Sequence, residues 1–159
     1  MKKIQSLRTA LTAALPELQT DPDRLRLWVE DGSASSRQTQ SLGFGFTYRA
    51  NLLIEEASTD IALIALPIFI WLRVHQPELL RPGAEGFSFE VDILDNRCAD
   101  ILIRLQLTEN ITVGTREEGG WDVNYQDEPD PLFDDGLPPW DLDDVPPFAA
   151  VTTEAHSAP

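Results

Sequence analysis

The hydrophobic pattern predicts a helix that lies against a two-stranded hairpin. Residues 61–72 carry no charge and would span about 18 Å as a helix, whereas the hydrocarbon core of a bilayer is about 30 Å thick. We therefore expect a buried core helix and no membrane span. Apolar and polar residues then alternate over 87–94 and 99–107, and the Asp-Asn-Arg at 95–97 between them suits a turn. Helix and hairpin each supply the apolar surface that the other needs.

The residues upstream predict a second helix and a further strand. Apolar positions recur every three or four residues over 4–18, which is typical of an amphipathic helix, and Pro16 should end it. Alternation over 25–30 then predicts a strand that stops at 31–32. Trp28 falls on the polar side of this strand, which makes its indole a candidate for partner binding.

A polar loop is expected at 33–41, followed by an unusually long strand over 44–54 that extends beyond the body of the sheet. The uncharged helix should begin at N-cap oxygens around Asp60 and end near Gln76, before the next proline. Pro67 leaves two alternatives, because a proline is costly inside a helix and tolerated in its first turn. Either the helix is kinked there or its regular part begins there.

Beyond the hairpin, Ile111 and Val113 begin a weaker strand, and alternation resumes over 121–125 after a Gly-Gly turn. Trp121 in this segment is a second candidate contact residue. The element order predicts an α+β fold with a mainly antiparallel sheet of four to six strands and two helices packed on one face. We assign this domain to residues 1–126.

Residues 127–159 are expected to form an extended acidic arm, not a domain. They contain seven of the 12 prolines, and no run is long enough to bury its own side chains. The aromatic residues Phe133, Trp140 and Phe148 stand among aspartates and prolines. This composition is typical of a segment that orders on a partner surface, and a merely solubilising tail is the alternative.

The charge distribution argues against nucleic-acid binding. The net charge is −15, all 12 Lys and Arg precede residue 126, and nine of the 27 acidic residues follow residue 125. Binding to DNA phosphates requires Lys and Arg to displace counterions, so we expect no direct tight contact with nucleic acid.

Cys98 is the only cysteine, so no internal disulfide can form, and we expect it to be a small buried residue near a strand start. Polar residues interrupt the N-terminal 15 residues, which therefore lack the continuous apolar stretch of an export signal. Both observations favour assembly in a reducing cytoplasm.

The residues do not form the constellations of an enzyme. His75 is expected to be partly exposed near the last carbonyls of its helix, and His156 lies in the arm. Cys98, His75 and a carboxylate lack the paired spacing of a zinc site, and there is no phosphate-binding loop or dinucleotide fingerprint. The imaginable acid–base pairs are Asp92 with Asp95 and Glu55 with Glu56. We expect solvated edges and turns there, and therefore no catalytic residue, metal or cofactor.

Several ordered segments carry a family resemblance. They are IQSLRTALTAALPEL at 4–18, DPDRLRLWVEDG at 21–32, WLRVHQPELL at 71–80, ILDN at 93–96 and QLTE at 106–109. Over roughly the first 115 residues the chain resembles the tail completion protein R family of contractile-tailed temperate bacteriophages and related phage-tail-like bacteriocins.

The resemblance implies a structural virion protein, not an enzyme. It would cap or complete the head-proximal end of a contractile tail, end tube or sheath growth and prepare head–tail joining. Its expected partners are copies of itself in a hexameric ring, tail tube or sheath proteins, and head–tail connector proteins. It would be assembled in the host bacterial cytoplasm and located in the virion.

Two other functions remain open from the residues. An acidic α/β dimeric secretion or folding chaperone is the main alternative, because small size, low isoelectric point and mixed helices and strands fit it as well. A hydrolase that acts through clustered acids is the third.

Overall fold

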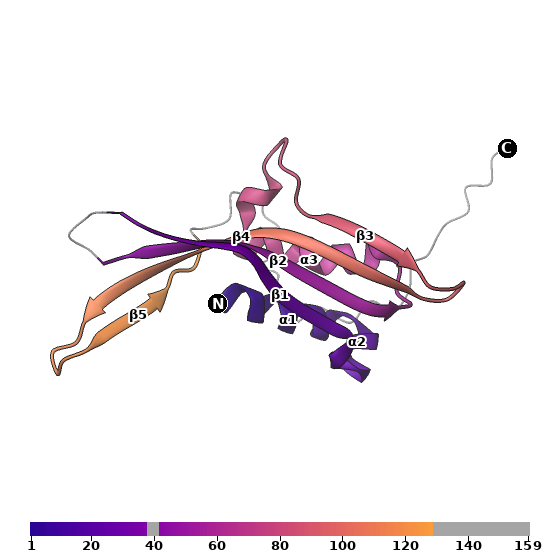
Figure 1. Cartoon of the computed structure of the whole chain (residues 1–159), viewed down its shortest axis with the longest axis horizontal. Helices are drawn as coiled ribbons and strands as arrows, with labels where there is room; N and C mark the ends of the chain where they lie inside the picture. Colours follow the sequence, from indigo (N-terminus) through magenta and orange to yellow (C-terminus); the bar gives the residue numbers. More distant parts are fainter. Residues whose placement is uncertain (38–41, 129–159) are drawn as a thin grey trace, which may run out of the picture.

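A computed structural model describes residues 1–37 and 42–128 (Figure 1). Its architecture is an antiparallel sheet with helices on one face, which confirms the predicted α+β class. Phe133, Trp140 and Phe148 lie outside the described residues.

The described part of the chain contains three α-helices and five strands. The helices are α1 (Lys2–Ala14), α2 (Pro16–Thr20) and α3 (Ile61–His75), with short 3-10 turns at Pro22–Arg24 and Pro77–Leu80. The strands are β1 (Leu25–Ser36), β2 (Phe44–Ala57), β3 (Ser88–Ile93), β4 (Ala99–Thr115) and β5 (Trp121–Tyr125). The strand order is β1-β2-β4-β3, and β5 also pairs with β4. Ile111 of β4 is paired with both Phe44 and Tyr125, so β2 and β5 lie on opposite edges of β4.

The core lies between the helices and the inward faces of the two central strands. Its fully buried side chains come from both layers: Leu7 and Leu11 on α1, Ile64, Ile68, Trp71 and Leu72 on α3, Tyr48, Leu52 and Ile54 on β2, and Ile103 and Leu107 on β4. Residues that face each other across an antiparallel pair point to the same side of the sheet. The pairing of Leu52 with Ile103 therefore continues the apolar face that the alternating pattern predicts.

Proline divides the first predicted helix in two. Leu15 is extended, with φ −102° and ψ 116°, because the ring of Pro16 excludes helical geometry from the preceding residue. Pro16 then begins α2, whose Leu18 is fully buried. The apolar stripe over 4–18 is thus shared by two helices.

Helix α3 begins at the N-cap residue Asp60, as the sequence predicts. The carboxylate of Asp60 accepts a hydrogen bond of 2.8 Å from the backbone N–H of Ala62. Helical structure then continues from Ile61 through the buried Pro67 to His75, so the regular part does not start at the proline. Gln76 follows as the C-cap residue.

The expectation that the whole uncharged stretch is hidden is wrong for one side of α3. Leu72 is fully buried, whereas Leu66, Phe69 and Val74 are 42–43% exposed. The sheet covers only one side of the helix, and side chains on the other side remain partly in contact with solvent. An apolar surface is therefore left facing outward.

Two strands are longer than the alternating pattern predicts. The pairing of β1 with β2 shifts register between Glu30 and Ser33, and Asp31 has a positive φ of 50°, so 31–32 forms a bulge and not a strand end. Ser33 to Ser36, predicted as loop, belong to β1. Strand β4 likewise continues without a break to Thr115, so the weak strand predicted at Ile111 is its second half.

Cys98 is not the buried residue that its position suggested. It is partly exposed in the turn before β4, where its Sγ lies 3.4 Å from Oδ1 of Asp95. Asp95 also accepts the backbone N–H groups of Arg97 and Cys98, so this segment is an aspartate-capped turn.

The uneven burial of α3 predicts that the same Leu→Ala substitution destabilises the protein by different amounts at two positions of the helix. Leu72→Ala should lower the free energy of unfolding by about 2–5 kcal/mol, because it leaves a cavity in the core, whereas Leu66→Ala should cost less than about 1 kcal/mol. Urea unfolding of both variants measures the difference. Equal losses would contradict the described orientation of α3.

Candidate interaction surfaces

Strand pairs project past the helices at one end of the molecule (Figure 1). In the β4–β5 hairpin, Trp121 and Val123 lie on the same side as Val113, because the register pairs Thr115 with Trp121 and Val113 with Val123. Their side chains are 57% and 52% exposed. Trp121 is thus on an apolar ridge that no described residue covers.

Trp28 lies on the opposite face of the sheet from Trp121. It pairs with Asn51, whereas its neighbour Leu27 pairs with the core residue Leu52. The indole N–H of Trp28 donates to Oε1 of Glu30 at 2.9 Å. The two tryptophans predicted as contact residues therefore belong to separate surfaces.

The open face of the sheet around Trp28 is mainly polar. A row across the strands is formed by Trp28, Asn51, Arg104 and Ser88. Arg104 donates to Glu90 at 2.7 Å, and this hydrogen bond is the main cause of the lowered pKa of Glu90. Asn51 is the buried member of this row, and its amide nitrogen has no hydrogen-bond partner in the described residues.

A third surface joins the outer side of α3 to the edge strand β3. Phe89, Val91 and Ile93 pair with Ile103, Ile101 and Ala99, so they face the helix side of the sheet. They are nevertheless 51%, 42% and 75% exposed, so the helices do not cover these side chains. Phe87 connects the two parts by packing on Phe69, with ring centroids 5.0 Å apart. We call Leu66, Phe69, Val74, Phe89, Val91 and Ile93 the α3–β3 face.

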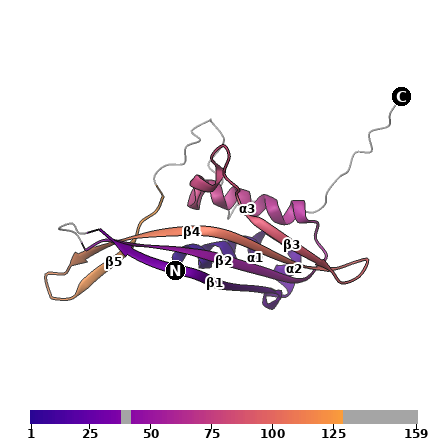
Figure 2. The same cartoon turned by 45° about the horizontal axis from the view of Figure 1, so that its top comes forward.

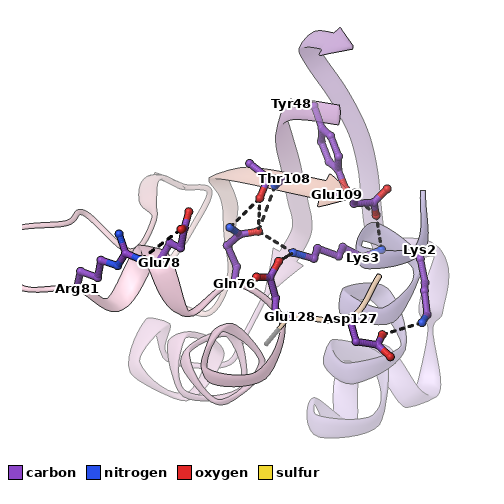
Figure 3. Close-up of polar contacts among 10 residues, drawn as sticks. All are labelled: Lys2, Lys3, Tyr48, Gln76, Glu78, Arg81, Thr108, Glu109, Asp127 and Glu128. Atoms are coloured by element: carbon purple, nitrogen blue, oxygen red, sulfur yellow. Dashed lines mark hydrogen bonds and ion pairs between the residues drawn. The ribbon is translucent and has the colours of Figure 1, made fainter. Parts of the chain in front are cut away.

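A buried polar cluster fixes the last described residues to the start of the chain (Figure 3). The ammonium group of Lys3 lies 2.5 Å from Oε1 of Glu128 and donates to Oε1 of Gln76 at 2.9 Å. The side chains of Lys3 and Glu128 are only 8% and 15% exposed. Gln76 in turn accepts from the backbone N–H of Thr108 at 3.1 Å, which links β4 to the end of α3.

Glu109 caps α1 from the same cluster. Its carboxylate accepts the backbone N–H of Lys3 at 2.6 Å and the hydroxyl of Tyr48 at 3.2 Å. A carboxylate is favourable at the positive end of a helix dipole. Burial raises the pKa of Tyr48 far above its ordinary value, and the charge of Glu109 adds to this effect. No local pattern in the sequence predicts this cluster, since 106 residues separate Lys3 from Glu109.

Three residues of the candidate acid–base pairs, Glu55, Glu56 and Asp95, are engaged in ordinary surface interactions. An open, charged depression of about 480 Å³ includes Glu55 and Glu56 among its lining residues. Glu55 pairs with Arg26 at 3.1 Å and Glu56 pairs with Arg24 at 3.0 Å. Backbone hydrogen bonds from the turn at 95–98 lower the pKa of Asp95. These contacts are structural and assemble no acid–base dyad.

His75 and Cys98 do not approach each other. Gln76, next to His75, contacts Thr108 in the middle of β4, whereas Cys98 precedes the first residue of β4, about 30 Å away along the strand. Within residues 1–37 and 42–128 no three His, Cys, Asp or Glu residues are placed to hold a metal ion. As predicted, His75 is partly exposed, but its ring packs on Trp71 at a centroid distance of 4.8 Å.

The geometry thus defines a small α+β protein with large apolar side chains exposed on several sides. Residues 1–129 match the family described as P2 phage tail completion protein R (GpR). Tail completion protein R of Escherichia phage P2 is 37% identical over 134 residues, which cover 82% of this chain and 86% of that protein. No solved structure matches.

The chain therefore belongs to the P2 phage tail completion protein R family. This confirms the resemblance, and the family is one of structural phage proteins, not of known enzymes. Membership supports a role in the structure or assembly of a phage tail, with a location in the virion. It favours this role over the chaperone and the hydrolase. In the described part of the chain, no helix is long and apolar enough to cross a membrane.

His75 should make stability depend on pH. Burial lowers its pKa, and the nearby Lys3 lowers it further, whereas Asp127 and Glu128 act in the opposite direction. The unfolded chain takes up a proton near pH 6.5, but the folded chain does so only at lower pH, so stability falls as the pH drops from about 7.5 to 5.5.

His75→Gln should flatten this pH dependence, as measured by urea unfolding at pH 7.5 and 5.5. His156→Gln, at the chain's only other histidine, is the matched control and should keep the wild-type slope. An unchanged slope in His75→Gln would show that other groups titrate in this range.

Proposed function

We propose that this protein completes the head-proximal end of a contractile phage tail or phage-tail-like particle. It ends growth of the tube or sheath there and prepares the tail for head joining. The observation that carries this proposal is the match of residues 1–129 to a family of tail completion proteins. The described fold supports it, because its exposed residues form contact surfaces and not a catalytic site.

A closed ring of identical subunits is the assembly that we propose, with six copies to follow the symmetry of the tail. Strands β1, β3 and β5 are outer strands of the sheet, and the β4–β5 hairpin projects beyond the helices. Outer strands and apolar projections favour association, and a ring satisfies such contacts without the continued growth of an open stack.

Trp28 and Trp121 serve different contacts in this proposal. They lie on opposite faces of the sheet, so one subunit can contact a neighbour through one face while the other meets a tail tube, sheath or connector protein. Phe133, Trp140 and Phe148 add contacts from the arm to an adjacent subunit or to the sheath.

The charge of the protein suits a structure through which a genome passes. With a net charge of −15 the subunits repel DNA phosphates, so the proposed ring binds no nucleic acid tightly. The protein is made in the host bacterial cytoplasm and remains in the virion at the head-proximal end of the tail.

A phage or particle genome with this gene removed tests the capping role. We expect tails of uncontrolled length that lack heads in negative-stain images, with normal tails restored when the gene is supplied in trans. Native mass spectrometry of the purified protein should show a species of about six subunits of 17.8 kDa. Tails of normal length joined to heads in the deletion would overturn the proposal.

The β4–β5 hairpin can be tested without unfolding the protein. Trp121→Ser with Val123→Ser should leave the melting temperature within a few degrees of wild type, because both side chains are more than half exposed. The same variant should fail to restore capped tails to the deletion. Arg116→Ala on the same hairpin is the control and should restore them. Full complementation by the double variant would exclude this hairpin from the assembly contacts.

A further inference from the structure

The α3–β3 face is a candidate binding surface that neither comparison assigns. Helix α3 contains one Arg, one His and no acidic residue between Ile61 and His75, and it is apolar around its whole circumference. A helix of that kind is normally buried on all sides. Here its outer side and the neighbouring strand β3 together expose six large apolar side chains. Contiguous exposed apolar surface of this kind marks an interaction site.

We propose that the α3–β3 face is the docking site of residues 129–159, the part of the C-terminal arm that follows Glu128. The described chain ends at Glu128, whose carboxylate is fixed to Lys3 beside Gln76, the C-cap residue of α3. The arm therefore starts at one end of the helix that carries the exposed face. A ligand tethered at the edge of its site has a high effective concentration there.

The length of the arm is sufficient. The 15 residues of α3 span about 22 Å, and 31 further residues reach about 100 Å when extended. The arm can thus run along α3 and reach β3 on its own subunit or on the next one. Phe133, the first aromatic residue of the arm, is the fifth residue after Glu128, and this length of chain is enough to pass Val74 at the near end of the face.

The composition of the arm complements this face. Residues 129–159 contain seven acidic residues and no Lys or Arg, so the other acidic surfaces of the protein repel them. Helix α3 has no acidic side chain and therefore does not repel them in this way. Phe133, Trp140 and Phe148 recur every seven or eight residues, which gives the apolar face three anchors. Seven prolines fall in the whole arm, and proline reduces the conformational freedom that a segment loses when it binds.

The competing occupant is the β4–β5 hairpin of a second copy, which is also apolar. Trp121 and Val123 are exposed at the other end of the sheet from β3 (Figure 1). This hairpin has no tether to the face and depends on subunit concentration, whereas the start of the arm is held beside α3. The arm is therefore favoured.

Site-specific photo-crosslinking in the full-length protein tests the proposal. With p-benzoylphenylalanine in place of Trp140, we expect crosslinks to peptides from 61–75 and 87–94 after digestion and mass spectrometry. The same probe in place of Trp28, on the open face of the sheet, should not reach those peptides. Mixing isotope-labelled and unlabelled protein assigns the crosslinks to the same chain or to a neighbour, and either assignment supports docking of the arm.

Two matched double variants sharpen the result. Leu66→Ser with Val91→Ser should reduce the crosslink yield from position 140 about tenfold, the order of effect expected for loss of large apolar contacts. Arg116→Ser with Glu118→Ser changes two exposed side chains outside the face and should leave the yield unchanged. Crosslinking from position 140 in the protein with an unchanged α3–β3 face does not depend on these variants. The proposal therefore stays testable if a variant fails to fold.

Crosslinks from position 140 to other surfaces, or none to protein, would overturn the proposal. Crosslinks from a probe at position 121 to 61–75 or 87–94 would assign the face to the hairpin of a second copy instead. These measurements use purified protein, whereas tail length and head joining are scored in phage particles. Docking of the arm and capping of the tail can therefore fail separately.

Discussion

Helix α3 closes the core by seating Ile64, Ile68, Trp71 and Leu72 over the inward faces of β2 and β4. Each layer is too apolar to face water alone, so the contact determines the direction of the helix and the side of the sheet that it covers. Trp71 adds a directional element, because its indole N–H donates to the hydroxyl of Ser6 on α1 at 3.0 Å. The two helices are thereby held side by side above the sheet.

The same contact creates the exposed surfaces. Two helices laid over β1, β2 and β4 leave β3 uncovered, and the projecting β4–β5 hairpin extends beyond them. The apolar side chains of these strands alternate with polar ones just as the core residues do, yet they are exposed to solvent. A sheet wider and longer than its helical layer thus leaves core-like residues exposed, as expected for a protein that acts through assembly.

Local patterns in the sequence predict those parts of the fold that depend on residues close together in the chain. Alternation identified all five strands in outline, and the oxygens around Asp60 marked the start of α3, where its side chain caps the helix. The register shift at Glu30 and Ser33 could not be predicted, because a bulge inserts residues without ending the strand. Nor does alternation distinguish Val91 from Ile101, since an edge strand and a central strand share the same pattern.

The candidate contacts divide in the same way. Trp28 was correctly placed on the polar face, because period two fixes the side of a strand on which a residue lies. The outward side of α3 was missed. A helix that is apolar on all sides has no polar face in its sequence that would distinguish the buried side from the exposed one. The cluster of Lys3, Gln76, Glu109 and Glu128 was also missed, because it joins residues from the beginning, middle and end of the domain.

This cluster ties the last described residue and the end of α3 to the start of the chain. Lys3 binds the end of α3 and the beginning of the arm through one ammonium group, while its backbone N–H is held by Glu109. Removing one partner from a buried ion pair leaves a charge without compensation, which is costly in a site this enclosed. The point at which the arm leaves the domain is therefore fixed by the fold itself. Whatever the arm binds, its starting position is set before any partner arrives.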